Sequence, residues 1–275
     1  MCLPFALALA VIILTTSQRH TLDPRMPCGT NLSMMGKAML LYSNDYGDKP
    51  PRAGGHDSRW TGCIADWKAK DRRAAYGMAE DGTGGQMSIS ASLYLLVKYA
   101  EAAPKYFVCP GEKKTREFKV GDDDTRVNRP TLSELWDFGL NPSAHCSFAY
   151  QMPYNPYPLL VSSEPGMAIG ADRNPWMDEK KARSFSQFQP DLKPFKGTID
   201  QARFGNAVAH DGRGQNVLFL DTHVDFEKRP CCSLENDNIY TAWEGTDKLR
   251  GRIPQVGSVP ANPKDSLVVN DPPVK

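Results

Sequence analysis

Two histidines and two aspartates in the C-terminal half have side chains that could bind a metal ion. Asp172 follows an apolar run, His210 precedes the glycine-rich DGRGQ, and Asp221 and His223 flank Thr222. Imidazole nitrogens and carboxylate oxygens are ligands that zinc accepts. No spacing rule marks these residues as ligands, however, and aspartates in turns often bond local amides. The pattern therefore favours local hydrogen bonding, with a metal at Asp172, His210, Asp221 and His223 as the alternative.

A second oxygen-rich stretch is the acidic run GDDDT, which contains Asp122, Asp123 and Asp124. Loop carboxylates can bind calcium, but this run lacks the spaced ligands and the distal glutamate of an EF-hand. We interpret it as a solvated acidic turn. No cofactor is therefore expected, with calcium or zinc as the alternatives.

The sequence motifs of several enzyme classes do not occur. The chain has no Gly-x-Ser-x-Gly, Walker loop or His-Glu-x-x-His, and GTGGQ at 82–86 lacks the Lys-Ser/Thr of a phosphate loop. We predict no catalytic residue and a non-enzymatic function. The enzymatic alternative is a metal-dependent hydrolase that uses His210, Asp221 and His223.

Composition limits the partners. The chain has 275 residues, of which 40% are hydrophobic, and its 33 Lys+Arg against 32 Asp+Glu leave a net charge of +1 with no basic block. Nucleic-acid binding needs concentrated positive charge. We therefore expect a substantial core and no nucleic-acid partner.

The N-terminus is apolar and uncharged from Leu3 to Leu14. About twelve residues are too few to cross a hydrocarbon core that needs roughly twenty, but they suit a signal-peptide core or an export anchor. We predict an exported protein of the cell surface, the extracellular space or the periplasm. Apart from Cys2, six cysteines could then form disulfides in fifteen possible pairings: Cys28, Cys63, Cys109, Cys146, Cys231 and Cys232.

Two helices are predicted from hydrophobic periodicity. Residues 30–46 have apolar side chains at three- and four-residue steps, with Thr30 as a cap candidate and Gly47 as a stop. Pro24 and Pro27 are expected to separate this helix from the apolar N-terminus. Residues 88–103 predict a second helix, capped by Ser88 or Ser90 and ended by a proline.

Several strands follow. Residues 105–109 and 167–171 each read as a strand, and alternation over 146–152 predicts a strand with one buried face. Residues 217–220 and 223–226 have hairpin spacing around Asp221 and Thr222. The elements predict an α+β protein in three parts: an apolar leader or anchor with its connector (1–27), an α+β domain with long loop insertions (28–252), and a proline-rich tail, extended or packed on an edge (253–275).

Three segments, in order, resemble the bacterial prepilin-type proteins with a C-terminal His…Asp-Gly domain, a type II secretion pseudopilin-like family of planctomycete-type genomes. CGTNLSMMGKAMLLYSNDYGDKPP is similar to the family's first helix, SLYLLVKYAEAAPKYFVCPG to its middle helix and Cys-Pro exit, and HDGRGQNVLFLDTHVDF to its histidine, glycine-rich loop and hairpin. The family's Gly-Phe-Thr-Leu-Ile-Glu processing motif does not occur between Met1 and Thr21. Thr222 stands where the family has glycine.

The resemblance implies a pilin-like fold, in which an N-terminal helix packs on an antiparallel sheet. It also implies an exported structural subunit that is anchored in a membrane, or assembled into a filament or fimbrium of identical subunits, through residues 3–14. A deletion of residues 1–27 is then expected to abolish multimeric particles. The alternative is a surface module for carbohydrate or another ligand, based on exposed tryptophans such as Trp60, Trp67, Trp176 and Trp243.

Overall fold

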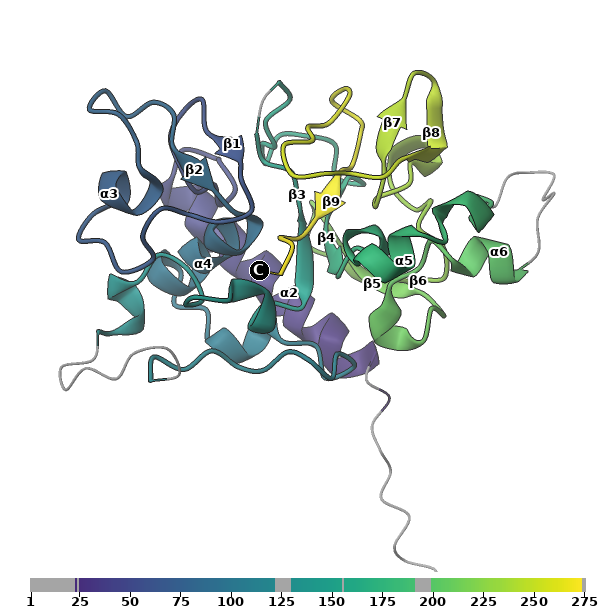
Figure 1. The fold of residues 1–275 in the computed structure, drawn as a ribbon, viewed down its shortest axis with the longest axis horizontal. Helices are drawn as coiled ribbons and strands as arrows, with labels where there is room; N and C mark the ends of the chain where they lie inside the picture. Colours follow the sequence, from purple (N-terminus) through teal and green to yellow (C-terminus); the bar gives the residue numbers. More distant parts are fainter. Residues whose placement is uncertain (1–22, 24, 122–129, 155, 191–198, 274–275) are drawn as a thin grey trace, which may run out of the picture.

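A five-stranded antiparallel sheet with a long helix across one face forms the centre of the molecule (Figure 1). The computed structural model describes residue 23 and residues 25–121, 130–154, 156–190 and 199–273. The mixture of helices with antiparallel strands confirms the α+β class.

The order of strands in the sheet is β6-β5-β4-β3-β9, and every neighbouring pair is antiparallel. The strands are β3 (Phe148–Gln151), β4 (Ala168–Asp172), β5 (Gln215–Phe219), β6 (Val224–Glu227) and β9 (Val268–Val269). The predicted strands at 146–152 and 167–171 and the predicted hairpin are therefore present, with boundaries shifted by a few residues.

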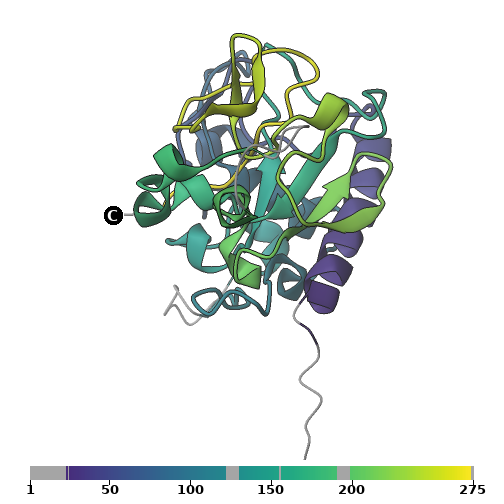
Figure 2. The same cartoon turned by 90° about the vertical axis from the view of Figure 1, so that its right-hand side faces the viewer.

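Strand β3 is buried on both faces of the sheet, so the expectation of one buried face for residues 146–152 was wrong. Phe148 and Tyr150 of β3 belong to the larger core under the long helix, whereas Ala149 between them belongs to a second core on the opposite face. Trp176 and Phe188 fill that second core. Figure 2 shows the chain that follows β4 covering this side of the sheet, opposite the long helix.

The long helix, α2 (Arg25–Asp45), starts earlier than predicted. Pro27 lies in its first turn, where a residue without an N–H removes no intrahelical hydrogen bond. The expectation that Pro27 interrupts the helix was therefore wrong. The carboxylate of Asp23 accepts the N–H of Arg25 at 3.1 Å. At the other end Gly47 takes the left-handed conformation, and the N–H of Asp48 donates to the carbonyl of Ser43.

The second helix, α4 (Ile89–Tyr99), has the predicted start, because the Ser88 hydroxyl accepts the N–H of Ala91 at 2.9 Å. The segment after it was predicted as a strand, and this was wrong. Residues Pro104–Phe107 form a 3-10 helix, η1, with its proline at the first position, where the fixed φ of proline favours a helical turn.

The remaining helices and strands are short and lie mainly in the long connections. They are β1 (Arg59–Trp60) and β2 (Gln86–Met87), which pair in parallel, α3 (Arg72–Tyr76), α5 (Glu179–Ala182), α6 (Ile199–Arg203), and the hairpin β7 (Ala242–Glu244) with β8 (Asp247–Arg252). Further 3-10 turns are η2 (Leu132–Glu134), η3 (Pro142–Ala144), η4 (Pro175–Met177), η5 (Phe185–Gln187), η6 (Val208–His210) and η7 (Leu234–Asn236).

The C-terminal segment is built into the body of the protein. Its strand β9 forms an edge of the sheet next to β3. Beyond it, the buried carboxylate of Asp271 accepts the N–H groups of Ile89 and Ser90 at the start of α4, together with the indole N–H of Trp60. The predicted boundary between the α+β domain and the tail, at residue 252, thus lies before β9, which is a strand of the central sheet. The predicted boundary at residue 27 falls inside α2.

Among the described residues, no helix has both the length and the apolar character needed to span a membrane. The apolar run 3–14 lies outside the described residues, as do Asp122, Asp123 and Asp124 of the candidate calcium turn.

Candidate functional site

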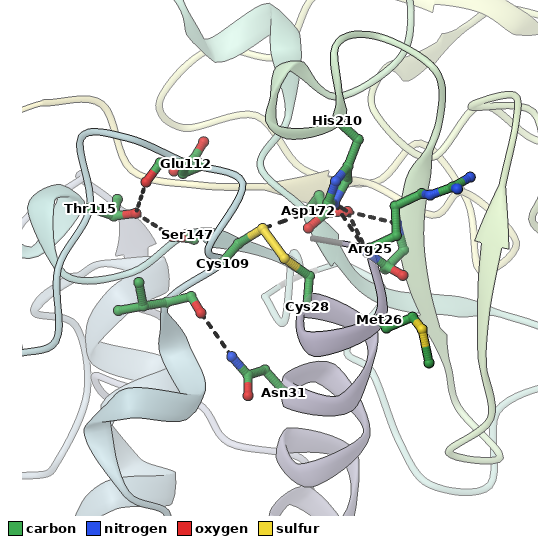
Figure 3. Close-up of a disulfide and its surroundings, with 12 residues drawn as sticks. Arg25, Met26, Cys28, Asn31, Cys109, Glu112, Thr115, Ser147, Asp172 and His210 are labelled. Atoms are coloured by element: carbon green, nitrogen blue, oxygen red, sulfur yellow. Dashed lines mark hydrogen bonds and ion pairs between the residues drawn. A yellow bond between two sulfur atoms is a disulfide. The ribbon is translucent and has the colours of Figure 1, made fainter. Parts of the chain in front are cut away.

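Four segments that are far apart in the sequence meet at the first turns of α2. Cys28 comes from α2, Cys109 follows η1, Asp172 is the last residue of β4, and His210 ends η6. All four are buried, and one ligand-type atom from each lies within 4.8 Å of the others. Figure 3 shows the two sulfurs bonded to each other, with His210 and Asp172 beside them. We call these four residues the Cys-His-Asp centre.

A disulfide joins Cys28 to Cys109 across 81 residues, with a Cα–Cα distance of 5.0 Å. It is the one disulfide among the six described cysteines, so the structure forms none of the fifteen complete pairings. In the loop-closure account a cross-link of this span stabilises by about 4–5 kcal/mol. The amide of Asn31 donates to the carbonyl of Val108 at 2.8 Å and attaches the same loop to α2 a second time.

Asp172 and His210 form a buried pair next to the disulfide. His210 Nε2 lies 3.0 Å from Asp172 Oδ2 and 3.9 Å from the Sγ of Cys109. Oδ2 also accepts the backbone N–H of Asn216 at 2.6 Å and its side-chain amide at 3.1 Å. Asn216 therefore orients the carboxylate from β5. Sequence reasoning missed this residue, although a polar amide inside the apolar run NVLF was a usable signal.

The other two metal candidates lie elsewhere, in the turn of the β5–β6 hairpin. Asp221 and His223 bond each other there, and their side chains are 45% and 46% exposed. Removal of water raises the pKa of Asp221, but the hydrogen bonds from His223 outweigh it, so the pKa lies below its usual value. Within the described chain, Asp221 and His223 do not join Asp172 and His210 in a common group of ligands.

The hairpin turn itself is one residue wider than the sequence spacing suggested. The N–H of Phe219 donates to the carbonyl of His223, and the N–H of Thr222 donates to the carbonyl of Phe219. Thr222 has φ of 73°, in the left-handed region. This matches a three-residue connection, in which a type I turn is followed by one left-handed residue.

A cavity of about 370 Å³ lies near the Cys-His-Asp centre. Its lining includes Glu112, Arg173, Lys113 and Lys114, with Ala209, the neighbour of His210. Glu112 Oε2 lies 3.6 Å from the guanidinium of Arg173. Burial raises the pKa of Glu112, and the charge of Arg173 opposes this rise. Oε2 of Glu112 and Nε of Arg173 are buried and make no hydrogen bond.

Two of the four tryptophans considered as sugar platforms are buried, so that part of the prediction was wrong. Trp60 donates its indole N–H to Asp271, and Trp176 fills the core between the sheet and Phe188. Trp67 and Trp243 are half-buried. The indole N–H of Trp243 donates to Asp237 at 2.6 Å.

Comparison with known proteins adds no identification. No family model matches the chain, and no curated protein and no solved structure is significantly similar to it. Function must therefore be argued from the geometry described above.

Proposed function

We propose that the protein is an exported pilin-like structural subunit that assembles with identical copies through α2 and the apolar segment before it. One observation carries this proposal: α2 lies across an antiparallel sheet with one face buried, while its outer face exposes large apolar side chains. The same outer face also exposes Thr30, Lys37 and Asn44, so a neighbouring helix would pack on apolar side chains that stand between polar ones.

The inner face of α2 is fitted closely to β5. A Cβ added at Gly36 would lie 2.8 Å from a methyl carbon of Leu218, and one added at Gly29 would lie 3.0 Å from the side-chain oxygen of Asn216. Leu32, Met35 and other apolar residues of this face are buried in the larger core. The helix therefore approaches the strands as a rigid, well-packed element.

The outer face is apolar at several positions. Met26 is 70% exposed, Leu41 64% and Leu40 48%. The first of these lies in the first turn of α2, twelve residues after Leu14 in the sequence. Scattered exposed apolar residues are ordinary, but these three lie on a single helix that follows an apolar segment in the sequence. In an assembly, neighbouring helices would remove them from water, with the sheet domains around the outside.

The test uses the full-length protein without detergent and compares the wild type with a Leu40→Asn/Leu41→Asn double variant. Val256→Asn is the control, since Val256 is also exposed but lies in the C-terminal segment. We expect electron microscopy and light scattering to detect multimeric particles for the wild type and the control, and not for the double variant. A monomeric wild type, or particles unchanged in the double variant, would contradict the proposal.

The cavity beside Glu112 and Arg173 favours a second candidate, a surface module that binds a small ligand. Its volume is in the range of small-molecule sites. Acidic residues such as Asp178 and Asp211 also line the cavity, and Lys113 and Lys114 are the cations that could contact an anionic group. A thermal-shift screen with acidic sugars and small carboxylates tests this. A ligand of this site should raise the melting temperature of the wild type, and the rise should shrink in a Lys113→Gln/Lys114→Gln variant. A screen with no stabilising compound would reject the candidate.

A further inference from the structure

The geometry points to two alternative states of the Cys-His-Asp centre. We propose that reduction of the Cys28–Cys109 disulfide converts Cys28, Cys109, His210 and Asp172 into a four-coordinate zinc site. This inference is independent of the assembly proposed above, because it concerns a buried cluster at the inner face of α2.

The spacing of the ligand atoms supports this. In a tetrahedral zinc site a histidine nitrogen and a carboxylate oxygen lie about 3.3 Å apart, and a sulfur and a nitrogen about 3.5 Å apart, as follows from the usual bond lengths. His210 Nε2 lies 3.0 Å from Asp172 Oδ2 and 3.9 Å from Cys109 Sγ. Only the two sulfurs must move substantially, from a covalent bond to a separation of about 3.8 Å.

The polar partners of the site also fit a metal. The two amide groups of Asn216 hold Asp172 in place, as a supporting residue does for a ligating carboxylate. Asp172 Oδ1 is buried and accepts no hydrogen bond. A buried carboxylate oxygen without a partner is rare, and a cation bound at the neighbouring Oδ2 would lower the electrostatic cost of leaving Oδ1 unpaired.

The donor set selects the metal. Two thiolates, one imidazole and one carboxylate suit zinc, whereas calcium and magnesium prefer oxygen ligands only. The burial of all four residues favours a closed, structural site over a catalytic one, which would keep a position for water.

The conversion balances chemically with a dithiol as reductant. The dithiol breaks the sulfur–sulfur bond, gives two protein thiols and is itself oxidised to a disulfide. Zinc then displaces the two thiol protons and binds both sulfurs as thiolates. A small-molecule disulfide reverses the sequence: it takes two electrons from the thiolates by thiol–disulfide exchange, is itself reduced to thiols, and the ion is released. A groove lined by Arg25, Gly29, Asn216 and Phe226 lies next to the centre and offers a side for entry.

The test titrates Co²⁺, as a spectroscopic probe for zinc, into full-length protein that is either oxidised or reduced with a phosphine. We expect one equivalent to bind the reduced protein, with a thiolate-to-cobalt absorption band and the visible bands of a tetrahedral ion, and zinc to displace it. The oxidised protein should show neither band. Reduced protein without these bands would overturn the proposal.

Variants then identify the ligands. His210→Gln should remove a ligand and weaken cobalt binding, and Asn216→Ala should weaken it by roughly 10- to 100-fold, as for other supporting residues. His223→Gln is the matched control, because His223 also bonds an aspartate but lies in the exposed turn. Binding that is equally strong in His210→Gln, or lost in His223→Gln, would contradict the assignment.

Circular dichroism covers the case in which reduction unfolds the protein. If zinc then restores the folded spectrum in the wild type and not in His210→Gln, the metal replaces the disulfide as proposed. If zinc restores neither, the four residues do not form a metal site, and the disulfide is their only function.

Discussion

Helices α2 and α4 contact each other, yet the rest of the chain buries them to different extents. In α4 all residues from Ile89 to Val97 are buried, so the helix is enclosed on every side by its own subunit. In α2 only the inner face is enclosed, and Met26, Leu40 and Leu41 remain exposed. Tyr42 of α2 and Tyr46, just after its end, contact Tyr99 at the end of α4, which joins the two elements.

The difference separates two functions of an apolar helix. A helix that is buried on every side stabilises its own fold, so substitutions in it should lower the free energy of unfolding. A helix with exposed apolar side chains can bind a neighbouring subunit through them, so substitutions of these side chains should weaken assembly. Substitutions in α4, on the inner face of α2 and on its outer face should therefore lower stability by decreasing amounts.

The largest effect is expected in α4. Leu93 is fully buried, so Leu93→Ala removes packed methyl groups and leaves a cavity. Chemical denaturation should show a loss of about 2–5 kcal/mol in the free energy of unfolding. A loss below that of an ordinary surface substitution would mean that α4 is not enclosed as described.

A moderate effect is expected at the inner face of α2. Gly36→Val places a branched side chain against Leu218, which a single Cβ would already approach to 2.8 Å. Overpacking of this kind typically costs about 1–3 kcal/mol, measured by the same unfolding experiment. Lys37→Val, at the exposed neighbouring position, is the control and should leave stability nearly unchanged.

The start of α4 gives a pH-dependent prediction. Burial raises the pKa of Asp137 to about 7 from its ordinary value of 3.8, and the nearby Asp271 acts in the same direction. Asp137 accepts hydrogen bonds from the hydroxyls of Ser88 and Ser90, which an asparagine can also engage.

The sign follows from proton binding. Between about pH 4 and pH 7 the folded protein holds a proton on Asp137 that the unfolded chain has released, so this contribution to stability is present at low pH and is lost as the pH rises through 7. The Asp137→Asn variant lacks this pH-dependent contribution to stability. The free energy of unfolding of the variant, relative to that of the wild type, should therefore be higher at pH 8 than at pH 5. Parallel stability profiles would contradict the buried, protonated carboxyl.

The smallest effect on stability is expected at the outer face of α2. Leu41→Asn should change the free energy of unfolding by no more than about 0.5 kcal/mol, as is usual for an exposed position. Far-UV circular dichroism and denaturation of the monomer measure this. A large destabilisation would show that Leu41 belongs to the core of its own subunit, and its exposure would then carry no argument for assembly.

Elements whose signals are local in the chain were predictable. Ser88 caps α4 and Gly47 ends α2 through contacts with residues a few positions away, and periodicity placed β3 to β6. The early start of α2 was missed because a proline in a first turn is compatible with a helix. The strand expected at 105–109 failed because Pro104 starts a 3-10 turn, a preference that a short apolar run does not reveal.

The candidate site was predictable only in part. Asp172 and His210 were candidates from their types alone, and Asp221 with His223 was the pair that proximity in sequence suggested. The structure retains both histidines next to a carboxylate but puts them in different surroundings, one buried and one exposed. The partner of Cys28 lies 81 residues away, and no local pattern selects it from fifteen pairings.

Photo-crosslinking tests the central proposal, assembly through the outer face of α2, most directly. A photoreactive phenylalanine analogue would replace Leu41 in the full-length protein, with Asp247, exposed in the β7–β8 hairpin, as the comparison position. We predict that the Leu41 probe gives covalent multimers whose cross-links, mapped by mass spectrometry, reach α2 of a second copy. Cross-links confined to the parent subunit, or multimers formed only from the position of Asp247, would contradict assembly through α2.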